Sequence, residues 1–268
     1  FFSHTFKINK QQKNIEKHKK DLLLSILNKK ITLIDYENIR GKNGTRCLGF
    51  GRFAGIVGCY NTLNLYLKLQ KEKSLSRAFE INNYEQIKKL SFVRGRLVEL
   101  YQHNLVKINH SVLEIICASE LIRDGYLVNV EERLSDILVC DIFATKGDGS
   151  VIIEIETGFT PPAHALNTVD YYAARIMSKI ARYSKHCSKF CLATPVVGLL
   201  PIPSIFLMPP LARNTNDVKK NQAFCNTFYK NPPIEFDSIL NAHLHSIYLI
   251  NTDKVFAKQL DPQNYVDL

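Results

Sequence analysis

The chain has 268 residues, of which 46% are hydrophobic, and a formal net charge of +10. This length is enough for two modest domains. No apolar run reaches the roughly 18 residues that a membrane-spanning helix needs, so we expect no membrane contact and a cytoplasmic protein. The seven cysteines form no CxxC pair, which argues against a zinc site and favours free thiols in a reducing compartment.

The positive charge is concentrated at the start of the chain. Residues 1–90 carry 18 basic and 7 acidic side chains, a net charge of +11, whereas the remaining residues carry 17 and 18, a net charge of −1. A domain that binds nucleic acid through its overall charge is expected to be basic. The bulk charge after residue 90 therefore does not by itself predict DNA binding there.

The first ninety residues begin with a helix signal. Residues 14–30, NIEKHKKDLLLSILNKK, predict a basic helix, and residues 31–36, ITLIDY, predict a short strand. A Gly-rich stretch follows, which we interpret as close helix packing, because a phosphate-binding GxGxxG needs a preceding strand and tighter spacing. The apolar face of the helix consists of Leu22, Leu23, Ile26 and Leu27, and the glycines are Gly51, Gly55 and Gly58.

The stretch FFSHTFK, followed by LLSILNKKITLIDYENIRGKNGTRCLGFGRFAGIVGCYNTL, resembles the N-terminal domain of the saccharopine dehydrogenase and lysine-ketoglutarate reductase family. That family is related to alanine dehydrogenase, and the resemblance runs to about residue 90. It implies an NAD(P)-dependent oxidoreductase of lysine metabolism, in which the histidine of FxHxxK is an acid/base residue. This histidine falls on His4.

Two features of that family are not found in this sequence. Its earlier strands, with a second catalytic lysine, have no counterpart before Phe1, and no GxGxxG follows residue 91. We therefore interpret residues 1–91 as a partial alanine dehydrogenase-like α/β segment: a truncated remnant, a fusion or a gene-model join. NAD(P) is not expected to bind this chain alone.

After residue 91 the pattern changes to a regular series of helix and strand signals. Asn109 or Ser111 is the expected N-cap of the second helix, and Gly125 its end. Residues 201–268 are expected to be a C-terminal extension with one more helix and one strand. The remaining predicted elements are helices at 91–108 and 109–128, a strand at 128–134, a hairpin at 136–158, a helix at 168–187 and strands at 189–197 and 204–210.

The hairpin brings three carboxylates together. If Gly147 and Asp148 form a two-residue loop, Asp141 lies opposite Glu154, with Cβ atoms about 5 Å apart. Glu156 shares the strand face of Glu154, because side chains alternate with a period of two. Moving the loop by one residue puts Asp141 opposite Glu156 on the same side. A three-residue loop would instead turn the side chains of one strand to the opposite face of the sheet.

Like charges this close are costly to bury unless a cation or a proton lies between them. Oxygen ligands at this spacing suit Mg²⁺ or Mn²⁺, which can activate water for phosphodiester hydrolysis. We predict Glu114, Asp141 and Glu154 as metal ligands, and Asp141, Glu154 and Glu156 as catalytic residues. Glu114 lies in the middle of a predicted helix, and its direction is left open.

The order helix, three antiparallel strands, helix, strand resembles the PD-(D/E)XK nuclease superfamily over residues 105–200. The matching residues are Glu114, Asp141 and the triplet Glu154-Ile155-Glu156, in which Glu156 replaces the usual lysine. The resemblance implies an α/β fold with a restriction endonuclease-like α/β/α core and a mixed sheet. It also implies a metal-dependent nuclease with DNA as partner and a homodimeric state, or an inactive descendant. The predicted domains are thus 1–91, 92–200 and 201–268.

Several alternatives remain open. Glu154 and Glu156 can instead form the solvated face of an edge strand. The basic residues of the following helix can contact phosphates or form its solvated face, and we favour the latter. The histidines are expected to be surface or capping residues, with a second-shell role for His110 as the alternative. The basic residues are Arg175, Lys179, Arg182, Lys185 and Lys189, and the histidines are His110, His164 and His186. The resemblance to RecB-like members also implies a polar residue or tyrosine in this helix, which Tyr171, Tyr172 or Arg175 could supply.

Overall fold

The computed structural model describes residues 17–30, 79–81 and 83–268. These residues fall into two units, and the first consists of residues 17–30 and 159–171. It contains α1 (Lys17–Asn28) and the short 3-10 helix η2 (Pro162–His164). The predicted first helix is thus present, but Leu27 is exposed, contrary to the prediction, while Ile26 is buried. The predicted strand at 31–36, the Gly-rich stretch and His4 lie outside the described residues.

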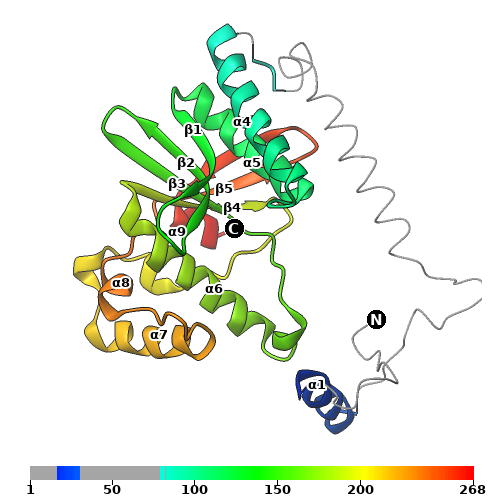
Figure 1. Cartoon of the computed structure of the whole chain (residues 1–268). Coiled ribbons are helices and arrows are strands. Elements are labelled where there is room, and N and C mark those ends of the chain that lie inside the picture. Colours follow the sequence, from blue (N-terminus) through cyan, green and yellow to red (C-terminus); the bar gives the residue numbers. More distant parts are fainter. Residues whose placement is uncertain (1–16, 31–78, 82) are drawn as a thin grey trace, which may run out of the picture. The chain divides into compact units, whose positions relative to one another are not determined.

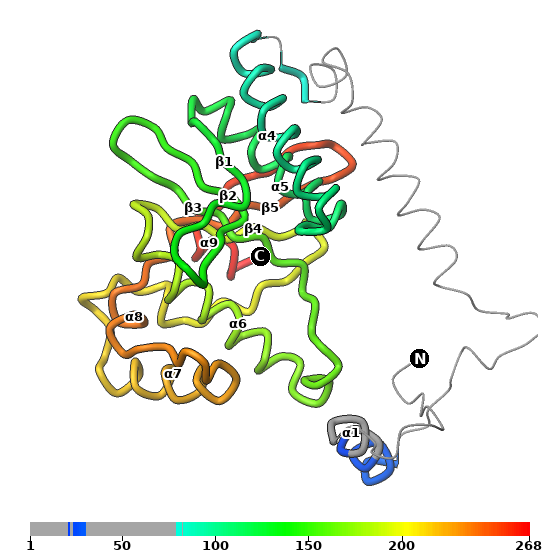
Figure 2. The backbone as a smooth tube through the Cα atoms, in the orientation of Figure 1, coloured from blue at the N-terminus to red at the C-terminus, as the bar shows by residue number. Residues whose placement is uncertain are grey.

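The second unit is built around a six-stranded mixed sheet in the order β1 to β6 (Figures 1 and 2). The first three strands are antiparallel, β3, β4 and β5 are parallel, and β6 is antiparallel to β5. The fold is therefore α/β, as expected. The strands are β1 (Leu127–Arg133), β2 (Val139–Lys146), β3 (Gly149–Ile155), β4 (Lys189–Pro195), β5 (Ser246–Asn251) and β6 (Phe256–Leu260).

Helices cover both faces of this sheet (Figure 1). Ile153 packs with Leu90 and Ile116 of the helices α4 and α5, whereas its neighbour Ile152 packs with Ile176 of α6 on the other face. Adjacent strand residues point to opposite faces, so a continuous apolar run fills both cores. The helices are α4 (Tyr84–Gln102), α5 (Ile108–Arg123), α6 (Thr168–Tyr183), α7 (Thr215–Phe228), α8 (Phe236–Leu240) and α9 (Pro262–Val266).

The predicted hairpin register is confirmed. Lys146 pairs with Gly149, and the ladder continues to Ile142 and Ile153, so Gly147 and Asp148 form the two-residue loop. Gly147 has a φ of +57°, a conformation that such a loop requires and that glycine adopts without strain. The turn therefore fixes the side of the sheet on which the paired residues between Ile142 and Ile153 lie.

Other local predictions were wrong. Helix α5 begins at Ile108 and its N-cap is Lys107, without a side-chain capping bond, so neither Asn109 nor Ser111 caps it. The predicted strand at 204–210 is instead a 3-10 turn, Ser204–Phe206, in a segment whose prolines have no N–H to donate to a sheet. The C-terminal region supplies two strands rather than one. It also contains α7, which was not predicted.

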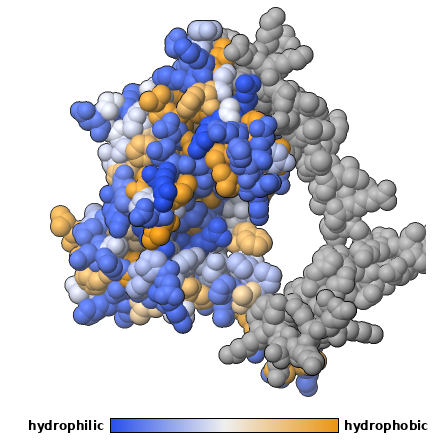
Figure 3. Space-filling model, viewed as in Figure 1, coloured by the Kyte–Doolittle hydropathy of each residue, from blue (hydrophilic) through white to orange (hydrophobic). Residues whose placement is uncertain are grey.

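None of the helices in the described part of the chain is long and apolar enough to cross a membrane. The face drawn in Figure 3 is mostly hydrophilic, with hydrophobic residues scattered in small groups. This view therefore offers no broad apolar surface of the kind that marks a membrane or an obligate protein interface.

The predicted domain boundaries at residues 91 and 200 remain predictions.

Arg213 connects the segments around α8 to the turn that precedes α7. Its guanidinium donates hydrogen bonds to the carbonyl oxygens of Ile205 (2.9 Å), Met208 (3.0 Å), Ile239 (2.7 Å) and Leu240 (2.8 Å), and the residue is 7% exposed. A lysine cannot reproduce this planar set of donors. The Arg213→Lys variant should lose about 2–4 kcal/mol of unfolding free energy, because buried carbonyls lose their partners.

Urea denaturation of the full chain, followed by circular dichroism, measures this loss. Arg133→Lys is the matched control, because the Arg133 side chain is 67% exposed and its replacement should change little. Equal midpoints for the two variants would contradict the assigned role of Arg213.

Candidate functional site

The candidate site lies where the backbone pairing of β2 and β3 ends. One position beyond the Ile142–Ile153 pair, side-chain carboxylates replace carbonyls as acceptors. The Asp141 N–H donates to Glu154 Oε1 (3.1 Å), and the Ile155 N–H donates to Asp141 Oδ2 (2.5 Å). A backbone N–H of each strand thus donates to a side-chain carboxylate of the other strand. These hydrogen bonds hold the carboxylates of Asp141 and Glu154 in place on the sheet.

Glu154 and Glu156 are buried beneath α6, with 2% and 1% exposure. Strand β3 lies between β2 and β4, so the solvated-edge alternative is wrong. Lys179 of α6 reaches both carboxylates: its Nζ is 2.8 Å from Glu154 Oε2 and 2.7 Å from Glu156 Oε1. Arg175 Nε also contacts Glu156 Oε1, at 3.1 Å. For Lys179, the favoured expectation of a solvated helix face is therefore wrong.

On the other side of the sheet, α5 contributes Glu114 and His110. Glu114 is fully buried, which answers the open question of its direction, and neither of its carboxyl oxygens has a hydrogen-bond partner in the described chain. His110 lies one turn earlier on the same helix face. Its Nε2 is 3.3 Å from Asp141 Oδ1 and 4.0 Å from Glu114 Oε1. His110 thus contacts the carboxylates, which agrees with the alternative expectation of a supporting role beside the ligands better than with a surface role.

Glu131 is a further member of this cluster that the sequence did not identify. It lies in β1 between Val130 and Glu132, which pair with Ile142 and Cys140, so Glu131 stands opposite Asp141. Its φ is +50°, an uncommon conformation for a residue with a side chain, and such residues concentrate at functional sites. Extending the hairpin register to β1 would have pointed to it, but the connection between β1 and β2 gives no comparable turn signal.

The cluster changes the proton affinities of its members. Burial, followed by the charges of Asp141 and Glu131, raises the pKa of Glu114 to about 10. Burial and the charge of Asp141 likewise raise the pKa of Glu154 to about 8, although Lys179 acts in the opposite direction. Burial also acts to raise the pKa of Asp141, but the hydrogen bond from His110 and the charge of Lys179 outweigh it and hold that pKa below its usual value.

The remaining residues that the sequence analysis named make other contacts. His164 stacks on Tyr171 within the first unit, with ring centroids 4.1 Å apart. Arg182 donates to the Pro232 carbonyl, and Lys185 is exposed. Tyr172 is close enough to the cluster that burial and the charge of Glu156 raise its pKa to about 12.

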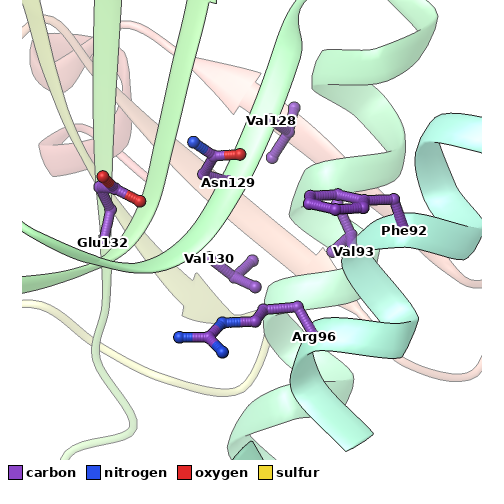
Figure 4. Close-up of a pocket in the computed structure, with 7 residues that line it drawn as sticks. All are labelled: Phe92, Val93, Arg96, Val128, Asn129, Val130 and Glu132. Carbon is purple, nitrogen blue, oxygen red and sulfur yellow. The ribbon is translucent and has the colours of Figure 1, made fainter. Parts of the chain in front are cut away.

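A separate hollow lies between α4 and β1 (Figure 4). It combines apolar side chains with one residue of each charge and has no cluster of ligands or nucleophiles. The residues that line it are Phe92, Val93, Arg96, Val128, Asn129, Val130 and Glu132. The carboxylate cluster is therefore the better candidate for chemistry.

Comparisons with known proteins found a short match. The chain is similar to alpha-aminoadipic semialdehyde synthase of Arabidopsis thaliana, with 42% identity over 64 residues, which are 24% of this chain and 5% of that protein. The mitochondrial alpha-aminoadipic semialdehyde synthase of Mus musculus is 39% identical over 64 residues, 24% of this chain and 6% of its own length. No family model and no solved structure matches.

The match supports the resemblance to the lysine-ketoglutarate reductase and saccharopine dehydrogenase family for a short segment. It spans only a small part of those proteins. Nothing in the comparisons corresponds to a nuclease, so the resemblance to the PD-(D/E)XK superfamily stays a prediction.

Replacing Lys179 with methionine should destabilise the protein strongly. The change would leave Glu154 and Glu156 buried without their shared ammonium, and removing one partner of a buried ion pair costs about 3–5 kcal/mol. Urea denaturation in the presence of a chelator measures the effect. Lys185→Met is the control, because Lys185 is exposed. A loss no larger than that of the control would mean that Lys179 does not compensate these carboxylates.

Proposed function

We propose that the second unit is a divalent-metal-dependent phosphodiesterase of the nuclease type. The single observation that carries this proposal is Glu114, a fully buried carboxyl whose two oxygens lack hydrogen-bond partners in the described chain, next to Asp141. A buried carboxylate is stable only with a proton or a cation beside it. The order of elements α5, β1, β2, β3, α6, β4 supports the proposal, because it is the order expected for such a nuclease.

The residues fit a metal ion. Glu114 and Asp141 offer oxygen atoms from a helix and a strand, and Glu154 lies beside Asp141. These are the ligand types that Mg²⁺ and Mn²⁺ prefer. When bound, such an ion lowers the pKa of water and polarises a phosphoryl oxygen. Asp141 is 16% exposed and His110 28%, so the open side of the cluster is the side on which a phosphate would arrive.

In this proposal, Lys179 supplies the ammonium group that the lysine of the motif usually provides. Glu156 occupies the motif position where most members of the superfamily have lysine, but it holds the Lys179 ammonium at 2.7 Å, beside Glu154. An ammonium placed here stabilises the negative charge that develops on the phosphate during hydrolysis. The substitution at position 156 is therefore compatible with activity, because the cation comes from α6.

Two measurements on the full chain test this proposal. Calorimetric titration with Mn²⁺ should show binding that Asp141→Ala abolishes and Asp148→Ala retains. Asp148 is the matched control because it lies exposed in the turn of the same hairpin. Supercoiled, linear and single-stranded DNA should then be incubated with Mg²⁺ or Mn²⁺, and Asp141→Ala should reduce cleavage by at least ~10²-fold. Metal binding without cleavage of any of these DNA forms would indicate an inactive descendant.

A second candidate function follows from the sequence comparisons. The short match to alpha-aminoadipic semialdehyde synthase, together with the resemblance around His4, supports a segment derived from an NAD(P)-dependent oxidoreductase of lysine metabolism. His4 lies outside the described residues, and no dinucleotide fingerprint follows residue 91 in the sequence. This candidate therefore concerns the origin of the segment more than an activity of the chain alone.

Fluorescence titration with NADH and NADPH separates the two candidates. The metal-site proposal expects no change in nicotinamide fluorescence up to millimolar cofactor. Saturable binding, with substrate turnover that His4→Ala removes, would instead make the oxidoreductase the function of this chain.

A further inference from the structure

The hollow between α4 and β1 (Figure 4) borders the carboxylate cluster. Val130 and Glu132 of β1 line the hollow, and Glu131, which lies between them in the chain, belongs to the cluster. Consecutive Cα atoms are only about 3.8 Å apart. A ligand with its phosphate at the cluster can therefore reach the hollow with a group that is a few bonds away from that phosphate.

An exposed aromatic ring forms one wall of the hollow. Phe92 is 65% exposed, and its ring extends from α4 toward Val128 and Val130 of β1 (Figure 4). The hollow has a volume of about 200 Å³, which is below the roughly 300–1,000 Å³ of pockets for drug-sized ligands. Its size and its wall therefore suit one small, flat ring system that stacks on Phe92.

The polar side chains around the hollow can both donate and accept hydrogen bonds. The guanidinium of Arg96 donates, the carboxylate of Glu132 accepts, and the amide of Asn129 does both. Glu99 holds Arg96 Nη1 at 3.0 Å, but the two side chains are 43% and 56% exposed, and exposed ion pairs contribute little free energy. Arg96 can therefore turn to a ligand at small cost. A nucleobase matches this set, because its edges carry N–H donors beside oxygen and nitrogen acceptors.

Basic side chains flank the aromatic ring along α4. Lys88, Phe92 and Arg96 recur at intervals of four residues and are all exposed, so they form one stripe on the surface of the helix. The whole helix carries four basic and two acidic side chains, a net charge of +2. Proteins that bind single nucleic-acid strands combine aromatic rings, on which bases stack, with cations that contact the phosphates. The stripe therefore fits a strand with exposed bases.

We propose that the hollow holds one unpaired nucleobase, stacked on Phe92, of the strand whose phosphate reaches the carboxylate cluster. The inference rests on the proposed phosphodiesterase function and names its substrate class, which is single-stranded or locally unpaired DNA. The bases of an intact duplex are paired and stacked, so none of them enters the hollow without the free-energy cost of unpairing. Arg96 and Glu132 bind the edge of the base, and Lys88 contacts the backbone of the strand.

Fluorescence anisotropy of the full chain with labelled DNA tests the proposal, with EDTA present so that no strand is cleaved. A single strand of about 12 nucleotides should bind at least ~10-fold more tightly than the blunt duplex of the same sequence. Phe92→Ala should weaken this binding by about 5- to 150-fold, which corresponds to the stacking of one base, whereas Phe92→Tyr should retain it. Tyr101→Ala is the matched control, because Tyr101 is an exposed aromatic residue two and a half turns further along α4, on its opposite side.

Two further measurements separate this inference from the proposed function. Titration of Phe92→Ala with Mn²⁺ should match the wild type, and its kcat/KM for cleavage of single strands should fall. An unchanged kcat/KM, or equal affinity for single strand and duplex, would overturn the inference and leave the phosphodiesterase standing. A single deoxynucleotide such as dAMP that bound as tightly as the strand would overturn the assignment to a strand, as would absence of binding to every DNA. Binding of single strands that depends on Phe92, without cleavage in Mg²⁺ or Mn²⁺, would support the base site and overturn the enzymatic function.

Discussion

The second unit of this protein is organised around an excess of carboxylates over cations at one end of a hairpin. Five acidic groups converge there, and in the described chain Lys179 and Arg175 are the permanent cations that contact them. Ionised groups in a low-dielectric interior must be paired or neutralised. Lys179 meets this requirement under α6, whereas on the α5 side the raised pKa of Glu114 favours its neutral, protonated form unless a cation binds there.

The mixed sheet makes such an arrangement feasible. Strand β3 is central, with α5 on one face and α6 on the other, so residues of both helices reach the same strand end from opposite sides. The carboxylates that replace backbone acceptors between Asp141 and Ile155 belong to the sheet itself. Groups fixed by strand backbone need little reorganisation to hold an ion or a phosphate.

The predictability of these features depends on how local their causes are. The register of the hairpin follows from a two-residue turn, so Asp141 and Glu154 could be placed opposite each other from sequence alone. The roles of Lys179 and Glu131 depend on how α6 crosses the sheet and on the pairing of β1, and neither is encoded within a few neighbouring residues. The predicted N-cap of α5 was wrong for a related reason. The prediction relied on the polar residues at positions 109 and 111, whereas the helix begins at Ile108.

The position of β5 has a consequence for the protein during its synthesis. Strand β4 pairs with β3 on one side and with Ser246–Asn251 on the other, and helices α7 and α8 separate β4 from the latter in the chain. Until that segment has left the ribosome, β4 presents an unpaired, hydrophobic edge, the kind of edge that templates pairing between chains. The nascent chain therefore passes through an aggregation-prone stage after α6 and β4 have formed. Pairing with β5, or binding of a chaperone, protects it during that stage.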